Sequence, residues 1–233
     1  MHTPPSTRNG SDHDDRHRGV RSSLDVEAIS AKSIGIVGGA YGLALDLARH
    51  QLRRVVYCDF DHVEPSNVTR QDFAQSETAQ LKAEVIAHRI EDINPHCNVH
   101  PLTRDVMHLS DTEEALLYDN ADLIIIATDS FRANATVNAE AMRRGIPVLH
   151  VSLYAGGGAG EVIYWIPGVT PACYRCIASE RYQYYENQEE STTPSDGATI
   201  FDLRAIDAVA GHIALGVLTA GADNRYGRLI ESL

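Results

Sequence analysis

Short apolar runs alternate with amphipathic stretches along the chain from residue 33 onward. The apolar runs predict six β-strands, at residues 33–38, 54–60, 98–106, 121–129, 146–154 and 160–167. Helical periodicity predicts helices at residues 40–52, 77–94, 132–144 and 200–221. Because strands and helices that alternate in this way are typical of βαβ units, we expect an α/β fold. It should have a doubly wound, mainly parallel sheet with flanking helices.

The clearest of the predicted helices lies at residues 77–94, and Asn94 and Pro95 mark its end. Its apolar residues repeat at the helical period and share one face: Leu81, Val85, Ile86, Ile90 and Ile93. Pro101 has no N–H to donate within a sheet, so the strand at 98–106 is expected at an edge. The polar segment 178–198 is predicted to be a long surface loop.

The length of 233 residues suits one α/β domain. Residues 1–30 begin with a polar stretch rich in Pro, Gly, Ser and His, and they are predicted to be a disordered leader. Residues 31–233 are predicted to form the folded domain. The leader has no apolar segment of a secretion signal, and the four cysteines include a Cys-x-x-Cys pair. A cytoplasmic location is therefore expected.

The charge and hydropathy of the chain exclude two classes of partner. The formal net charge is −12, whereas nucleic-acid binding requires clustered Lys and Arg. No apolar run approaches the roughly 18 residues that a membrane span needs. We therefore expect neither nucleic acid nor a membrane as a partner.

Glycines 38, 39 and 42 lie where the first predicted strand passes into the first predicted helix. Glycine allows a tight turn and a close approach of the backbone to a phosphate, which the start of a helix stabilises. Their spacing does not match G-x-G-x-x-G cleanly, and a simple βα turn would also use them. Asp59 ends the second strand, where an acid in a Rossmann-like fold accepts hydrogen bonds from a ribose. Together these residues favour nucleotide binding but do not separate NAD from ATP.

Three later residues favour ATP and adenylyl transfer. Attack on an α-phosphate builds negative charge, which Arg70 and Lys82 are placed to neutralise. Asp129 ends the most apolar strand, and its carboxylate is a suitable ligand for a Mg²⁺ ion that bridges phosphates. Hydride transfer to NAD has no evident use for this set.

These segments resemble the ThiF/MoeB superfamily of ubiquitin-like-protein-activating enzymes. The shared segments are CDFDHVEPSNVTRQ, AQLKAEVIAHRIEDINPH, LIIIATDS and PACYRC, in the same order and at similar spacings, so that the resemblance covers roughly residues 33–220. It implies that residues 31–233 form a nucleotide-binding adenylation domain. It also implies a role for each matching residue: Asp59 on the ribose, Asn67, Arg70, Gln71 and Lys82 on the phosphates, and Asp129 on Mg²⁺. We place Asp61 beside Asp59 among the nucleotide-binding residues.

The reaction implied by the resemblance is adenylation of a C-terminal glycine carboxylate, with release of pyrophosphate. The expected partner is a small ubiquitin-like or sulfur-carrier protein or a peptide, and the expected assembly is a homo- or heterodimer. ATP and Mg²⁺ are the expected cofactors.

The chain also departs from the superfamily pattern. Members carry an N-terminal arginine that reaches the phosphates of the neighbouring subunit, and here Arg16, Arg18 and Arg21 lack that motif. Cys173 and Cys176 match half of a four-cysteine Zn²⁺ site, and no cysteine follows them. Three alternatives stay open at this point: zinc is lost, it is shared across a dimer, or its site is completed by residues beyond this chain. The segment 182–198 has no cysteine for a thioester, which favours adenylation alone.

Two alternatives to an adenylyltransferase remain at the level of sequence. The first is a non-catalytic subunit that binds a ubiquitin-fold partner. It is favoured by the glycine turn, which is shorter than the superfamily pattern, by the missing arginine motif and by the half zinc site. The second is an NAD-dependent oxidoreductase.

Overall fold

The structure is a computed structural model that describes residues 18–186 and 197–230. Its centre is one sheet of six strands in the order β3-β2-β1-β4-β5-β6. The strands are β1 (Ser33–Gly38), β2 (Arg54–Cys58), β3 (Asn98–Leu102), β4 (Leu123–Ala127), β5 (Val148–Leu153) and β6 (Gly160–Trp165). The first five strands are parallel, and β6 pairs with β5 in the antiparallel direction. The predicted α/β class, the mainly parallel sheet and the edge position of β3 are confirmed.

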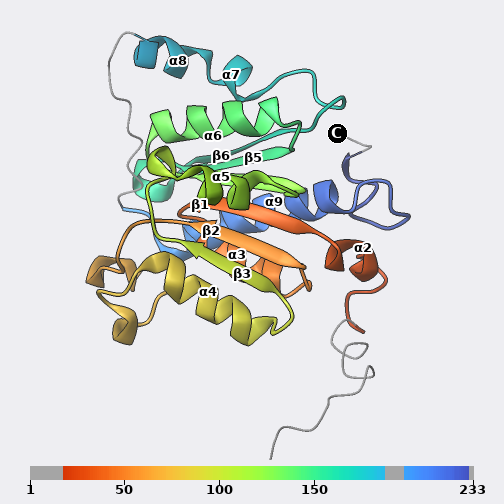
Figure 1. Ribbon diagram of the computed structural model, residues 1–233, viewed down its shortest axis with the longest axis horizontal. Coiled ribbons are helices and arrows are strands. Elements are labelled where there is room, and N and C mark those ends of the chain that lie inside the picture. Colours follow the sequence, from red (N-terminus) through yellow and green to blue (C-terminus); the bar gives the residue numbers. More distant parts are fainter. Residues whose placement is uncertain (1–17, 187–196, 231–233) are drawn as a thin grey trace, which may run out of the picture.

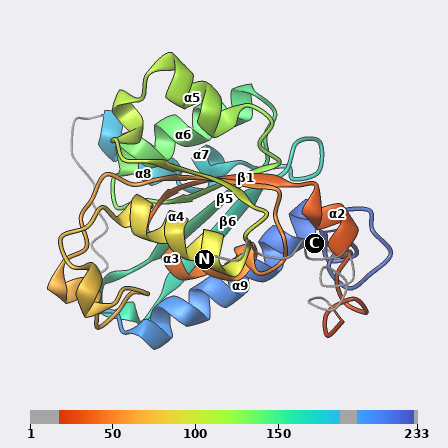
Figure 2. The ribbon, with the colours of Figure 1, turned by 60° about the horizontal axis from the view of Figure 1, so that its bottom comes forward.

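Helices cover both faces of this sheet (Figure 1). One face carries α3 (Tyr41–Ala48), α4 (Lys82–Ile93) and α9 (Ile200–Leu218), and the other carries α5 (Asp111–Tyr118) and α6 (Phe131–Arg143). Figure 2 shows α3 and α9 side by side below the sheet, with α5 and α6 above it. None of the helices in the described ranges is long and apolar enough to cross a membrane.

The central strands are buried on both faces because their side chains alternate between two cores. In β4, Leu123 and Ile125 pack with α3, α4 and α9, whereas Ile124 and Ile126 pack with α5 and α6. All four side chains are at most 1% exposed. Double burial explains why this strand is an unbroken apolar run rather than an alternating one.

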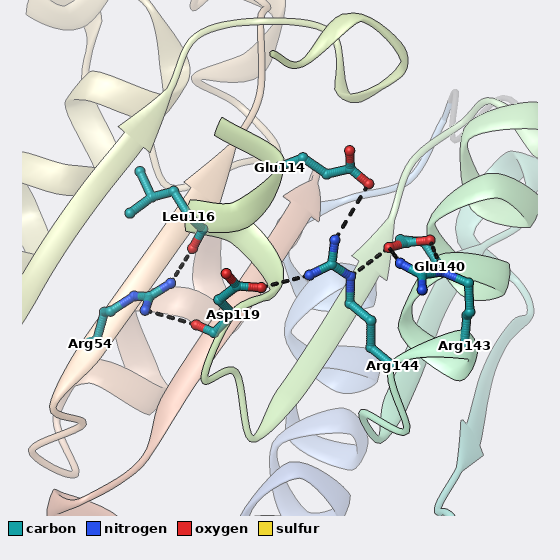
Figure 3. A network of polar contacts seen from close by, with 7 residues as sticks. All are labelled: Arg54, Glu114, Leu116, Asp119, Glu140, Arg143 and Arg144. Atoms are coloured by element: carbon teal, nitrogen blue, oxygen red, sulfur yellow. Dashed lines mark hydrogen bonds and ion pairs between the residues drawn. The ribbon is translucent and has the colours of Figure 1, made fainter. Parts of the chain in front are cut away.

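A polar network ties the helices to the sheet at the amino ends of the strands (Figure 3). Arg54 begins β2 and donates to the carbonyl oxygens of Leu116 and, at 3.0 Å, Asp119. Arg144 follows α6 and pairs with the Asp119 carboxylate at 2.6 Å and with Glu140. The network therefore joins β2, α5 and α6 on the side of the molecule opposite the strand carboxyl ends.

Several predicted boundaries are corrected by the structure. The predicted helix at 77–94 begins only at Lys82, after a 3₁₀ turn at Gln75–Glu77. The predicted loop at 178–198 contains the helix α8 (Ser179–Glu186), which follows the single turn α7 (Tyr174–Ile177). Residues 187–196 of that loop lie outside the described residues.

The leader prediction is also corrected in part. Residues 1–17 lie outside the described residues, but α2 (Val26–Ser30) falls within the predicted leader. Its N-cap Asp25 accepts a hydrogen bond from the Ala28 N–H at 2.9 Å. Leu24 and Ile29 are 2% and 0% exposed within the core of α3, α4 and α9. Residues 24–30 therefore belong to the folded unit.

Candidate functional site

A cavity of 820 Å³ opens at the carboxyl ends of the strands. Its walls include Gly38 at the end of β1, Asp59 after β2, Asp129 after β4 and Ser152 near the end of β5. Because β1 and β4 are neighbours whose chains continue in opposite directions across the sheet, this cavity lies at the topological switch point. Ligands of doubly wound proteins bind at this position.

The cavity brings together most of the predicted site residues. It is lined by Gly38, Gly39, Asp59, Asp61, Asn67, Arg70, Gln71, Lys82 and Asp129. Gly42, Cys173 and Cys176 do not line it, nor do Arg18 and Arg21 in the described part of the N-terminal region. Arg16 lies outside the described residues.

The glycine turn between β1 and α3 is held tightly against β4. Gly38 has a φ of 86°, and a Cβ there would lie 2.6 Å from the Ala127 carbonyl oxygen. The Gly39 N–H donates to the same oxygen at 2.8 Å, and the Gly38 carbonyl accepts from the Tyr57 hydroxyl at 2.6 Å. Only glycine fits at position 38, so this residue shapes the cavity floor.

Asp59 is 7% exposed, and both oxygens of its carboxylate already accept hydrogen bonds. The Tyr41 hydroxyl donates to Oδ2 at 2.8 Å, and the Asp61 N–H donates to Oδ1 at 2.8 Å. Burial raises the pKa of Asp59, while these two donors and the nearby Lys82 lower it. Each oxygen keeps a second lone pair, so the carboxylate retains acceptor capacity toward the cavity.

Lys82 begins α4 and is a buried cation in the cavity wall, with its side chain 8% exposed. Its Nζ lies 3.2 Å from Asp61 Oδ2 and 5.4 Å from the centre of the Tyr41 ring. The Lys82 N–H also donates to the Asp61 carbonyl at 2.9 Å. These contacts fix the start of α4 against the segment after β2.

The segment between β2 and α4 is shaped by its own polar side chains. A 3₁₀ turn spans Pro65–Asn67, and the Glu64 N–H donates to Asn67 Oδ1 at 2.8 Å. Asn67 is 4% exposed, so its amide builds the turn that presents Arg70 and Gln71. Gln71 Oε1 is buried without a hydrogen-bond partner among the described residues. Such an unsatisfied atom is consistent with a ligand or water in the cavity.

Asp129 lies between β4 and α6, directly before Ser130, whose hydroxyl caps α6. No group of three or more His, Cys, Asp or Glu side chains is placed to hold a metal within the described ranges. Mg²⁺ is commonly held by only one or two carboxylates together with substrate phosphates. A single carboxylate, that of Asp129, in a cavity of 820 Å³ fits that mode of binding.

Gly42 and the cysteine pair lie elsewhere. Gly42 is in the first turn of α3, where a Cβ would lie 2.7 Å from Asp207 Oδ2 and 2.9 Å from Asp72 Oδ2. Cys173 and Cys176 stand with their sulfur atoms 3.7 Å apart at the start of α7. Gly42 therefore permits close packing of α3, and the two thiols form a separate surface pair.

The residues of the cavity wall that were not predicted from the sequence include Tyr41 and Asp207. Tyr41 stands between Gly39 and Gly42, so the glycine turn itself is the signal that points to it. Asp207 comes from α9, and no local sequence signal links it to the cavity.

The parallel sheet and the cavity at its switch point define a Rossmann-like α/β protein. The chain belongs to the ThiF family, whose sequence profile matches residues 16–221. It is 32% identical over 152 residues to the sulfur carrier protein ThiS adenylyltransferase of Bacillus subtilis, covering 63% of this chain and 44% of that protein. It is 28% identical over 160 residues to the adenylyltransferase and sulfurtransferase UBA4 of Yarrowia lipolytica, covering 68% and 39%. The chain thus spans less than half the length of these relatives.

The fold is also similar to a solved structure of E. coli MccB with ATP. The TM-score is 0.66 at 18% identity, over 83% of this chain and 57% of that chain. At this identity the similarity supports the fold.

Proposed function

We propose that this chain is an ATP- and Mg²⁺-dependent adenylyltransferase. It would activate the C-terminal carboxylate of a small ubiquitin-like or sulfur-carrier protein, or of a peptide, and release pyrophosphate. The observation that carries the proposal is one cavity at the switch point that is lined by Asp59, Arg70, Lys82 and Asp129. The ribose requires an acid, the phosphates require cations, and a metal that bridges the phosphates requires a second acid.

In the proposed complex the buried Asp59 carboxylate accepts hydrogen bonds from the ribose hydroxyls. Arg70 and Lys82 neutralise charge that builds on the α-phosphate as the acyl oxygen attacks. Lys82 suits this role because its ion pair with Asp61 fixes its Nζ in the wall before substrate arrives. Asp129 would hold Mg²⁺, which supplies positive charge to the phosphates when it is bound.

No general base is required for this reaction. A C-terminal carboxylate has a pKa of about 3.3–3.7 and is already ionised at neutral pH. The protein therefore contributes position and charge neutralisation, and the carboxylate is the nucleophile.

The class of substrate is proposed from the named relatives. One relative is named for adenylation of the sulfur carrier ThiS, and the other is named as an adenylyltransferase and sulfurtransferase. We extend adenylation of a carboxyl terminus from them to this chain, together with assembly as a homo- or heterodimer. Transfer to Cys58 in the cavity wall is not part of the proposal, because burial raises the pKa of its thiol to about 12. The segment 182–198 before the last helix has no cysteine to take that role.

A second candidate function is a non-catalytic subunit of a larger assembly. It is favoured by the Tyr41 hydroxyl, which already bonds to Asp59, and by the glycine turn, whose Gly39 N–H is used within the protein. In this case the chain would bind a ubiquitin-fold partner without adenylating it.

ATP–pyrophosphate exchange in the presence of a carboxyl-terminal partner distinguishes the two functions. The adenylyltransferase gives partner-dependent exchange, and Asp129→Asn reduces it about 100-fold or more because the metal loses its protein ligand. Asp105→Asn is the matched control, since Asp105 lines the same cavity and an Asn can still cap its 3₁₀ turn. Wild-type exchange in Asp129→Asn would contradict the role of Asp129, and absence of exchange with every partner would favour the non-catalytic subunit.

A further inference from the structure

The start of α3 has no cap from its own segment. Its N-cap residue is Ala40, which offers no side-chain hydrogen bond. The Gly39 and Tyr41 N–H groups are used inside the turn, at 2.8 Å to Ala127 and 2.9 Å to Gly39. The first N–H groups of a helix need acceptors, and in Rossmann-like folds a ligand phosphate supplies them at this place.

In this chain a carboxylate from another helix faces this place. Asp207 of α9 lies close enough to the N–H of Leu43, the third residue of α3, for that N–H to lower the pKa of its carboxyl group. Its Oδ2 would lie 2.7 Å from a Cβ placed on Gly42, so it stands directly against the first turn. Asp207 also lines the cavity, which places its charge on the side that a phosphate would approach.

We infer that Asp207 is a built-in competitor of phosphate at the start of α3, so that nucleotide binding is coupled to uptake of a proton by this carboxylate. The inference rests on the proposed nucleotide site. It adds to that site a residue from outside the segments that define it, and a pH dependence of nucleotide binding that comes from this residue. A phosphate and an ionised carboxylate at one helix start repel each other, whereas a protonated carboxyl group removes that repulsion and can donate a hydrogen bond.

Charged or titratable side chains face Asp207 from three segments of the chain other than α9. Asp46 of α3 and Asp72 of the segment before α4 both face it, as does the Tyr57 side chain of β2. Arg204, one turn earlier on α9, is shared with Asp72 at 2.6 Å and Asp46 at 3.2 Å. One guanidinium thus serves three carboxylates, and it cannot fully neutralise all of them.

This surrounding favours the protonated form of Asp207 near neutral pH. The pKa of Asp207 is raised to about 7, chiefly by burial and also by Asp46 and Asp72, although Arg204 and the Leu43 N–H act to lower it. Because a bound phosphate disfavours the charged carboxylate, it raises this pKa again. Affinity should therefore increase as pH falls toward about 7, by up to about tenfold per pH unit, and level off below that pH.

Calorimetric titration with ATP at pH 6, 7, 8 and 8.5 tests the inference on the intact chain. The variants are wild type, Asp207→Asn and the control Asp46→Asn, which removes a charge from the same cluster at an exposed residue outside the cavity wall. An Asn at 207 keeps an oxygen that faces the Leu43 N–H and removes only the charge. Titrations in two buffers of different ionisation enthalpy at pH 7.5 count the protons taken up.

We expect Asp207→Asn to bind ATP about tenfold more tightly than wild type at pH 8 or above, with proton uptake lost. Protonation of ATP itself is common to all variants and cancels. Asp46→Asn should keep the proton uptake, with its pH profile shifted toward lower pH because Asp46 raises the pKa of Asp207. If only the Asp207→Asn variant binds ATP, that result also supports the inference. Equal pH profiles for wild type and Asp207→Asn would overturn the inference while leaving the nucleotide site intact. Absence of ATP binding by every variant at pH 6 would overturn both this inference and the proposed function.

Discussion

Replacement of Asp59 by Asn tests the ribose contact most specifically. The substitution keeps the shape of the side chain but leaves one acceptor oxygen in place of two. In the structure the Tyr41 hydroxyl and the Asp61 N–H already use one lone pair on each oxygen of Asp59. The variant therefore has too few acceptors for both protein donors and both ribose hydroxyls.

The expected loss of affinity follows from these hydrogen bonds. A hydrogen bond to a charged group contributes about 1.5–3 kcal/mol. Loss of one such bond, with weakening of the other, gives about 2–3 kcal/mol, which is roughly a 30- to 150-fold increase in the Kd for ATP.

We expect the weaker ATP binding of Asp59→Asn to occur without loss of folding. Burial raises the pKa of Asp59 in the folded protein, so its ionised form lowers stability at pH values above the unfolded pKa. An uncharged Asn avoids that effect, and we expect Asp59→Asn to be at least as stable as wild type at pH 7–8. Urea denaturation at pH 7.5 measures this alongside the binding assay.

Calorimetry with ATP and 2′-deoxy-ATP then isolates the ribose. Wild type should prefer ATP, whereas Asp59→Asn should bind the two nucleotides with nearly equal affinity. The matched control is Asp105→Asn, which removes the same charge from the same cavity. Equal losses in Asp59→Asn and Asp105→Asn, or an unchanged preference for ATP in Asp59→Asn, would refute a direct contact between Asp59 and the ribose.

Two further predictions concern the neighbour of Asp59 and the N-terminal helix. Tyr41→Phe removes the hydroxyl that bonds to Asp59 Oδ2, so ATP should bind several-fold more tightly by calorimetry; weaker binding would mean that this hydroxyl supports the site. Ile29→Ala should lower the free energy of unfolding by about 2–4 kcal/mol in urea, because Ile29 is fully buried, whereas the exposed control Glu27→Ala should change it by less than about 0.5 kcal/mol. Equal effects of these two alanine substitutions would contradict the packing of α2 against the core.

The fold was largely predictable because its strands are buried on both faces. Such strands are unbroken apolar runs, and Leu123–Ala127 is therefore recognisable without the structure. The helix α5 was missed because its periodicity is weak, although Ser110 and Glu113 form a capping box that marks its start. The helix α2 was missed because five residues following a polar leader carry little periodic signal.

The candidate site also contains residues that were predictable from the sequence and residues that were not. Residues such as Asp59 and Lys82 stand in contiguous segments at the ends of predicted elements, and parallel strands bring those ends to one edge of the sheet. Tyr41 and Asp207 could not be assigned in this way, because their roles depend on contacts between side chains. The contact of Asp207 with α3 spans more than 160 positions of the chain, and only the packing of α9 on α3 creates it.

The central claim is that a carboxyl terminus attacks ATP in this cavity. Its most direct test is ATP–pyrophosphate exchange with one small ubiquitin-fold protein or peptide prepared in two forms, with a free C-terminal glycine carboxylate and with a C-terminal amide. The free acid should support exchange, and the amide should give only the background seen without partner, because it lacks the ionised nucleophile. Equal exchange with both forms, or none with the free acid although ATP binds, would contradict the account.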